Sequence, residues 1–320
     1  MAAAKGTRAP QRIVLIGATA SGKSEVAFRL ARRFDGEILG ADSRQVYRGL
    51  EIGTAAPSPA ERSLVPHHFV SFLDPSEAYS AGRYACEARA AVLSVETRGR
   101  LAIVVGGSGL YVRALLRGLF EGPSRDEEVR GRLTARLRRE GLESLRVELG
   151  RVDPEALRAI LPGDSVRVIR ALEVHELTGR RISDLRREQA REPFEARVFG
   201  LRWPRAILAE RIAARFSRQL AGGFLDEAKR LREAQLPENA PGPRTLGYRE
   251  LIAHLSGEMS LEEAGALIMQ RTRQLAKRQE TWFKNMAAVT WFSLEKTEEL
   301  SRVAEAIGVE VTRGRDGEPV

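Results

Sequence analysis

The segment RIVLIGATASGKSEVAFRLARR, residues 12–33, decides the fold of this chain. Its first residues, 12–16, form a short apolar run rich in β-branched side chains, which suits a buried strand of a parallel sheet. The sequence GATASGKS at 17–24 follows at once and matches the pattern G-x-x-x-x-G-K-[ST]. From Glu25 onward the apolar residues recur at helical spacing. Strand, glycine-rich loop and helix therefore follow one another in the order of a phosphate-binding loop.

The chemistry of such a loop depends on groups at fixed places. Backbone N–H groups point at one anion, the helix N-terminus adds a partial positive charge, and Lys23 adds a full one. The hydroxyl of Ser24 is suited to Mg²⁺. The pattern does not distinguish a diphosphate from a triphosphate. The residues expected to bind it are Gly17, Ala18, Thr19, Ala20, Ser21, Gly22, Lys23 and Ser24.

Composition sets the class of protein. The chain has 320 residues, 43% hydrophobic and 30% charged, with a net charge of +9 and a pI near 10.1. Its excess of arginine over lysine suits bidentate contacts to phosphate, although a GC-rich genome produces the same excess. The single cysteine, Cys86, excludes an internal disulfide and fits a reducing compartment. With no membrane-length apolar run and no signal-peptide core, we expect a cytoplasmic protein without a membrane partner.

Further apolar runs at 37–41, 101–105, 198–203 and 288–294 are predicted strands, separated by helical segments. This alternation predicts an α/β fold, a P-loop parallel-sheet core with a helical insertion domain. Residues 42–75 are expected to be mostly loop, and Asp153 and Asp164 to begin helices. We assign the first part of the core to 12–121, the insertion to 122–196, the second part of the core to 197–311, and flexible tails to 1–11 and 312–320.

Polar residues follow two of the predicted strands. Asp42 follows 37–41, where a carboxylate can hold Mg²⁺, position a nucleophile, accept a proton or only stabilise a turn. Ser43, Gln45 and Tyr47 beside it carry hydrogen-bonding groups suited to a base edge. Ser108 follows 101–105 and either contacts substrate or caps the next helix. Strand 101–105 lacks the metal-binding aspartate typical of P-loop ATPases, which argues against ATP hydrolysis.

A long basic helix is predicted at 261–286. Arg273 and Lys277 share one face at four-residue spacing, and Gln274 and Arg278 form a neighbouring row. Such a row is commonly a solvated face, but the basic chain and the arginine-rich insertion favour an RNA backbone. The pair His67-His68 lacks further ligands at zinc-site spacing and is interpreted as structural.

The chain resembles the tRNA dimethylallyltransferases over residues 12–292. The resemblance is carried, in this order, by GATASGKS, ADSRQVYRGLEIGTAAP, VPHHFVSFLDPSEAYSAGRYA, VVGGSGLYVRALL, RALEV, PRTLGYREL and TRQLAKRQETWF. DSRQVY and TRQLAKRQ are specific to that family. Departures from its usual pattern are Ala18 for proline, Ser24 and Ser108 for threonine, Tyr84 for phenylalanine, and Val166 for glutamine, which removes the polar group of one tRNA contact.

The resemblance implies transfer of a dimethylallyl group from dimethylallyl diphosphate to N6 of adenosine 37, next to the anticodon of tRNA, giving N6-isopentenyladenosine. It implies Asp42 as general base, Ser108 as a substrate contact, and Arg215 or Arg211 as the main diphosphate arginine, with Mg²⁺ as cofactor and a monomeric state. The anticodon stem-loop would be contacted by Asp42, Ser43, Arg44, Gln45, Ser108, Arg130, Arg167, Arg170, Arg244, Gly247, Tyr248, Arg273, Gln274, Lys277 and Arg278.

Three other functions share some of these features. A P-loop kinase of a small metabolite would use the same loop but leaves the basic helix unexplained. A non-catalytic RNA-binding protein could use a nucleotide as a switch. A prenyltransferase acting on free AMP or ADP would have little need of the basic helix and the insertion.

Overall fold

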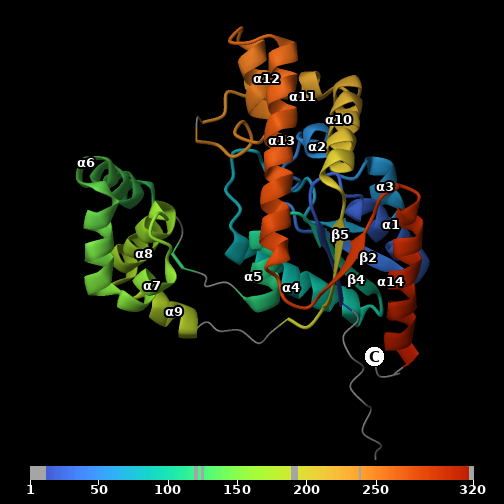
Figure 1. The fold of residues 1–320 in the computed structure, drawn as a ribbon, viewed down its shortest axis with the longest axis horizontal. Coiled ribbons are helices and arrows are strands. Elements are labelled where there is room, and N and C mark those ends of the chain that lie inside the picture. Colours follow the sequence, from blue (N-terminus) through green and yellow to red (C-terminus); the bar gives the residue numbers. More distant parts are fainter. Residues whose placement is uncertain (1–11, 119–121, 124–125, 189–193, 238, 317–320) are drawn as a thin grey trace, which may run out of the picture. The chain divides into compact units, whose positions relative to one another are not determined.

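The computed structural model describes residues 12–118, 122–123, 126–188, 194–237 and 239–316. In these residues a six-stranded sheet has the order β3-β2-β4-β1-β5-β6, and every neighbouring pair is parallel (Figure 1). The predicted parallel α/β core is confirmed. Its strands are β1 (Arg12–Gly17), β2 (Gly36–Gly40), β3 (His67–His68), β4 (Leu101–Gly106), β5 (Arg197–Arg202) and β6 (Val289–Ser293).

Helices bury both faces of the sheet, because its central strands are apolar on both sides. Ile13, Leu15 and Ile103 pack into one cluster with α1 (Lys23–Phe34) and the C-terminal helix α14 (Glu299–Asp316). The alternate residues Val14 and Val104 are equally buried but point the other way, toward the side covered by α4 (Ala81–Thr97), which contacts β2 and β4. The carboxyl ends of β1, β2 and β4 thus meet at one edge, where a ligand of an open parallel sheet binds.

The segment between β2 and α4 is mostly irregular, as predicted for 42–75. It also contains the short helices α2 (Glu51–Thr54) and α3 (Pro59–Leu64) and the two-residue strand β3. Ser58 and Glu61 form a capping box that starts α3. His68 bonds the carboxylate of Glu37 and His67 the carbonyl of Val65, which are structural roles.

The second half of the core is mainly helical. Helix α5 (Gly109–Arg117) ends the first part, and the second part contains α10 (Arg205–Ala221), α11 (Phe224–Glu233), α12 (Tyr248–Leu255) and α13 (Leu261–Lys284). Helices α10 and α11 follow β5 as a pair, and the long basic helix predicted at 261–286 is α13. α13 is the tall orange helix in Figure 1, and it packs against α10 and α12.

A separate compact unit spans Arg117–Pro193, against the predicted 122–196. Its described residues contain no strand and form α6 (Glu127–Val152), α7 (Pro154–Ala159), α8 (Ser165–Thr178) and α9 (Ile182–Glu188). Asp153 and Asp164 accept hydrogen bonds from backbone N–H groups three residues on, which confirms them as helix starts. The unit has its own core, in which Leu133, Leu145 and Val168 are fully buried.

The predicted tail at 312–320 is wrong at its beginning. Helix α14 continues to Asp316, because Leu300, Val303, Ile307 and Val311 recur at helical spacing and are buried against the core. Residues 1–11 and 317–320 lie outside the described residues.

Candidate active site

The loop between β1 and α1 has the geometry of an anion cradle. Gly22, just before α1, has a φ of +87°, a conformation that side chains with a Cβ rarely adopt. A Cβ at that position would also lie 2.7 Å from Cδ1 of Leu300. The loop is held from outside by Trp203, whose indole donates to the carbonyl of the buried Ser21 at 2.8 Å. Glycine and tryptophan thus fix the turn that presents the helix N-terminus to a ligand.

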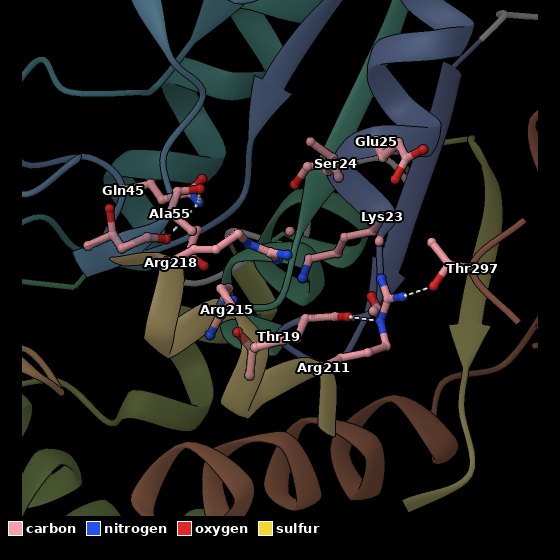
Figure 2. Close-up of a pocket in the computed structure, with 18 residues that line it drawn as sticks. Thr19, Lys23, Ser24, Glu25, Gln45, Ala55, Arg211, Arg215, Arg218 and Thr297 are labelled. Carbon is pink, nitrogen blue, oxygen red and sulfur yellow. Dashed lines mark hydrogen bonds between the residues drawn. The ribbon is translucent and has the colours of Figure 1, made fainter. Parts of the chain in front are cut away.

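The loop opens into a cavity of about 500 Å³ at the carboxyl ends of β1, β2 and β4. Figure 2 shows Lys23, from α1, extending into the same cavity as Arg215 and Arg218 from α10. Four cations and two carboxylates line it, so the cavity carries net positive charge suited to an anion. The lining residues include Thr19, Ala20, Ser21, Gly22, Lys23, Ser24, Glu25, Asp42, Gln45, Arg211, Arg215 and Arg218.

Burial lowers the pKa of Lys23 from 10.5 to about 8, an effect that Asp42 opposes and Arg215 reinforces. Its Nζ donates to the carbonyl of Ala18 at 3.1 Å, within the loop itself. Among the described residues no carboxylate forms an ion pair with this ammonium, so it gains most from an incoming anion.

Arg211 and Arg215 differ in what they contact. The Arg211 guanidinium donates to the carbonyl of Ala20 at 2.9 Å and to the hydroxyl of Thr297 at 2.6 Å, and it stacks on Trp203 at 4.3 Å. Nε of Arg215 is buried and has no hydrogen-bond partner among the described residues. Burial lowers the pKa of Arg215, with Asp42 opposing that shift and Arg218 adding to it. Arg211 therefore supports the loop, and Arg215 keeps donors for a ligand.

Arg218 was not predicted as a site residue. It lies seven residues after Arg211 and three after Arg215, so the three arginines share one face of α10, and this spacing could have revealed it. Its charge lowers the pKa of both Arg211 and Arg215. The described residues offer Arg218 no ion-pair partner.

Asp42 is positioned by the backbone around it. Its Oδ1 accepts the N–H of Arg44 at 2.9 Å, while Oδ2 has no hydrogen bond to the described residues. The hydroxyl of Ser108 accepts the N–H of Ser43 at 2.9 Å, and the N–H of Ser108 donates to the carbonyl of Ala41 at 3.1 Å. One oxygen of Asp42 thus stabilises a turn, and the residue also lines the cavity. The sequence had offered the turn and a role toward the ligand as alternatives.

The end of β4 holds Ser108 rather than a carboxylate. Ser108 was expected either to contact substrate or to cap its helix. In the structure its hydroxyl accepts the N–H of Ser43 across the strand ends, and its contact with substrate stays a prediction. Gln45 lies in the cavity with its amide nitrogen bonded to the carbonyls of Thr54 and Ala55, so its own carbonyl oxygen remains for a ligand. The amide of Gln45 therefore adds a neutral polar group to the lining of the cavity.

Comparison with known proteins decides the family. Residues 45–286 match the family model described as IPP transferase. The chain is 46% identical over 287 residues to the tRNA dimethylallyltransferase of Methylococcus capsulatus, covering 88% of this chain and 92% of that one. It is 44% identical over 283 residues to the same enzyme of Geobacter metallireducens, with the same coverage. The chain belongs to the IPP transferase family.

Two solved structures share the IPP transferase fold of this chain. The tRNA isopentenylpyrophosphate transferase of Bacillus halodurans is 35% identical, with a TM-score of 0.69 and coverage of 96% of this chain and 98% of that one. A eukaryotic dimethylallyltransferase acting on tRNA is 26% identical, with a TM-score of 0.81 and coverage of 97% and 80%. The family model begins at residue 45, so the phosphate loop and Asp42 are assigned from this chain's own residues.

This IPP transferase exposes part of its predicted tRNA surface. Arg273, Gln274, Lys277 and Arg278 are exposed on α13, and the described residues supply no ion pair to the three cations among them. Arg244 is also exposed. Their contact with tRNA stays a prediction.

The loop 243–248 contains one correction. The side chain of Tyr248 is fully buried, donates to Glu227 at 2.5 Å and accepts the N–H of Gly53 at 3.1 Å. Direct contact between this side chain and tRNA is therefore wrong for the structure described. Gly247 is buried as well, and a Cβ there would lie 2.7 Å from Phe224. Within the motif PRTLGYREL, the buried Gly247 and Tyr248 therefore hold the loop to the core, and Arg244 is exposed.

In the helical unit, two of the three predicted arginines hold a buried carboxylate. Glu173 is fully buried and accepts from Arg130 at 3.2 Å, from Arg170 at 2.8 Å and from the N–H of Asp126 at 3.0 Å. Arg167 is exposed and pairs with Asp164. The structure thus gives Arg130 and Arg170 a role within the unit, and their contact with tRNA stays a prediction.

Proposed function

We propose that this protein transfers a dimethylallyl group from dimethylallyl diphosphate to N6 of adenosine 37, next to the anticodon of tRNA. The observation that carries the proposal is that Asp42 lines the same cavity as Lys23, Arg215 and the phosphate loop. A diphosphate leaving group and a proton acceptor are the two groups that this transfer needs. The relatives described above support the same reaction, since they are tRNA dimethylallyltransferases and a eukaryotic dimethylallyltransferase acting on tRNA.

The reaction forms a bond between N6 of adenine and the allylic carbon as the carbon–oxygen bond to diphosphate breaks. The electron pair of that bond stays on the diphosphate, and the N6 proton passes to Asp42. An exocyclic amine is a poor nucleophile because its lone pair is delocalised into the ring, so a carboxylate bonded to N6–H offsets this as the new bond forms. Lys23 and Arg215 stabilise the charge that develops on the diphosphate.

Mg²⁺ fits this donor set. The described residues contain no cluster of three acidic, histidine or cysteine ligands, but Mg²⁺ bound to a diphosphate commonly takes few protein ligands and keeps several waters. The hydroxyl of Ser24 lines the cavity without a hydrogen bond to the described residues. Ser24 would hold the ion, which supplies charge neutralisation to the diphosphate when bound.

The target adenosine must leave the stacked anticodon loop, which costs a few kcal/mol. The exposed cations of α13 and Arg244 offset that cost through contacts to the RNA backbone. We expect a cytoplasmic enzyme that acts as a monomer. Within the described ranges, no helix combines the length and the apolar composition needed to cross a bilayer.

The test is mass spectrometry of an anticodon stem-loop incubated with the protein, Mg²⁺ and dimethylallyl diphosphate. The expected product has one dimethylallyl group in place of one hydrogen, located by fragmentation at the adenosine 3′ of the anticodon. A stem-loop with guanosine at that position is the control and should stay unmodified. Parallel incubations use AMP and ADP as acceptors, and ATP without RNA. Transfer to free nucleotides alone, or ATP turnover without RNA, would contradict the proposal.

A further inference from the structure

Gln279 joins the two loops that form the site. It lies on α13, one residue after Arg278, and its amide faces the core rather than the exposed row. Oε1 accepts the backbone N–H of Thr19, in the phosphate loop, at 2.8 Å. Nε2 donates to the carbonyl of Gly107, directly before Ser108, at 2.9 Å. One side chain therefore connects the loop after β1 with the loop after β4.

The two contacts require a primary amide. Thr19 offers a donor and Gly107 an acceptor, so the side chain between them must accept at one atom and donate at the other. A carboxylate only accepts, and a methionine of similar length does neither. The backbone of Gly107 also lies close to this amide, because a Cβ on Gly107 would lie 2.4 Å from Nε2 of Gln279. Position 107 therefore has no room for a side chain while the amide is in place.

The contacts continue across the strand ends. Gly107 is followed by Ser108, whose hydroxyl accepts the N–H of Ser43, and Ser43 follows Asp42. The network thus spans the ends of β1, β4 and β2, which are adjacent in the sheet. It fixes the distance between the residues that bind the diphosphate and the residue that accepts the proton.

We infer that Gln279 is a positioning residue, which holds the phosphate loop in register with Ser108 and Asp42 and does not itself contact tRNA. This inference rests on the proposed function. It separates Gln279 from its neighbours in the motif TRQLAKRQ, whose exposed cations face outward. A displacement of about 1 Å between reacting groups can lower a rate about 100-fold, so loss of this link should act on the chemical step.

The first variant is Gln279→Met, which keeps length and removes both hydrogen bonds. Gln270→Met is the matched control, since Gln270 is an exposed glutamine on the same helix outside the proposed binding residues. Single-turnover transfer at saturating donor and stem-loop should fall about 10- to 100-fold in Gln279→Met and remain at the parent rate in the control. Filter binding of the stem-loop should change less than about twofold. An unchanged rate, or a loss confined to RNA affinity, would overturn the inference.

A second variant separates positioning from general loss of stability. Gln279→Glu keeps the acceptor for Thr19 but sets a carboxylate against the carbonyl of Gly107. Protonation restores a donor, so the transfer rate of this variant relative to the parent should rise as the pH is lowered from about 8 toward about 5.5. A ratio that stays constant with pH would contradict the two-bond role. If the parent protein itself transfers no prenyl group, the proposed function fails. If the parent transfers the group and the Gln279 variants do so at the parent rate, only the inference about Gln279 fails.

Discussion

The hydroxyl of Ser108 accepts a hydrogen bond from the backbone N–H of Ser43, with 2.9 Å between the two atoms. This contact ties the loop after β4 to the loop after β2 and so fixes the residue before Ser43, the proposed base Asp42. This contact requires a hydroxyl oxygen as acceptor. Serine supplies it as well as threonine, the residue usual at this position in the tRNA dimethylallyltransferases. The position after β4 that carries a metal-binding aspartate in many P-loop ATPases here carries a serine hydroxyl, which holds the loop of Asp42.

Asp42→Asn is expected to lower the single-turnover transfer rate about 10²- to 10⁴-fold, because asparagine keeps the acceptor for Arg44 but not the basicity. Stem-loop affinity should change little. The assay is run near pH 7, since loss of the Asp42 charge lowers the pKa of Lys23 further. Asp74→Asn is the control, because Asp74 accepts a similar turn hydrogen bond from Ser76 outside the cavity. Reduced RNA affinity with an unchanged rate would make Asp42 a binding residue.

The lowered pKa of Lys23 predicts how diphosphate binding depends on pH. Inorganic pyrophosphate favours the charged lysine, so affinity should fall as the pH rises through about 8. Pyrophosphate titrates in the same range, so the measured quantity is the ratio of parent affinity to that of Lys23→Met, followed by calorimetry between about pH 7 and pH 9. The expected ratio declines with pH. A constant ratio would show that Lys23 does not titrate there.

The same pKa has a consequence for stability. A lysine whose pKa is lower in the folded state than in the unfolded chain binds fewer protons when folded, between about pH 8 and its ordinary value of 10.5. The free energy of unfolding contributed by Lys23 therefore rises with pH across that window. Below the folded pKa its buried charge destabilises the free protein, and Lys23→Met should melt at a higher temperature there while losing transfer activity.

The contacts of Arg215 and Arg211 predict different losses. Arg215→Met removes a guanidinium whose buried Nε has no hydrogen-bond partner in the described residues, so the rate at saturating donor should fall about 10²- to 10³-fold without a lower melting temperature. Arg211→Met removes the bonds to Ala20 and Thr297 and the stack on Trp203, so it should lower the melting temperature and raise the KM for donor. The comparison needs melting curves and single-turnover rates of both variants. The reverse pattern would make Arg211 the main diphosphate arginine.

What the sequence predicts well in this chain is local. The phosphate loop is a contiguous strand, turn and helix, so its residues and its geometry follow from one short pattern. Asp42 and Ser108 directly follow apolar strands, and a parallel sheet brings such positions to one edge. The face of α10 that carries Arg211, Arg215 and Arg218 follows from helical spacing, although only two of the three were recognised.

What the sequence does not show is which side of a motif faces inward. PRTLGYREL contains both the exposed Arg244 and the fully buried Tyr248, and their neighbourhood in sequence gives no sign of that difference. Gln279 contacts Thr19, which lies 260 positions earlier, so its role depends on the packing of α13 against the strand ends. Long-range contacts of this kind follow from the tertiary structure alone.

Replacing Tyr84 by phenylalanine should stabilise the protein. Its hydroxyl is buried without a hydrogen-bond partner in the described residues, while its ring stacks on Tyr111 at 4.4 Å. Tyr84→Phe should raise the free energy of unfolding by about 1 kcal/mol, because the unsatisfied buried hydroxyl is removed and the ring remains. The hydroxyl of Tyr111 donates to the carbonyl of Tyr79 at 2.9 Å, so Tyr111→Phe is the control and should lower stability. Denaturant unfolding measures both, and a destabilised Tyr84→Phe would refute this account.

The exposed cations of α13 should bind the RNA backbone without selecting the base. Cations that contact phosphates carry no direct sequence information, and each contact releases condensed counterions. Lys277→Ala combined with Arg278→Ala should therefore weaken all stem-loops by a similar factor. The log–log salt slope should become shallower by about 0.7 for each phosphate that the variant no longer neutralises. The choice of modified adenosine should not change, because it depends on groups around Asp42 and Gln45.

The measurement for α13 is a filter-binding salt series on two stem-loops, one with the target adenosine and one without. Arg32→Ala combined with Arg302→Ala removes the same charge from exposed positions on α1 and α14 and should keep the parent slope. That control separates local phosphate contacts from a general weakening of the positive field, which would act on both double variants alike. If the α13 variant kept the parent slope, or bound only one of the two stem-loops more weakly, α13 would not be a phosphate-binding surface. The exposed row would then be a solvated helix face, the alternative that the spacing of Arg273 and Lys277 left open.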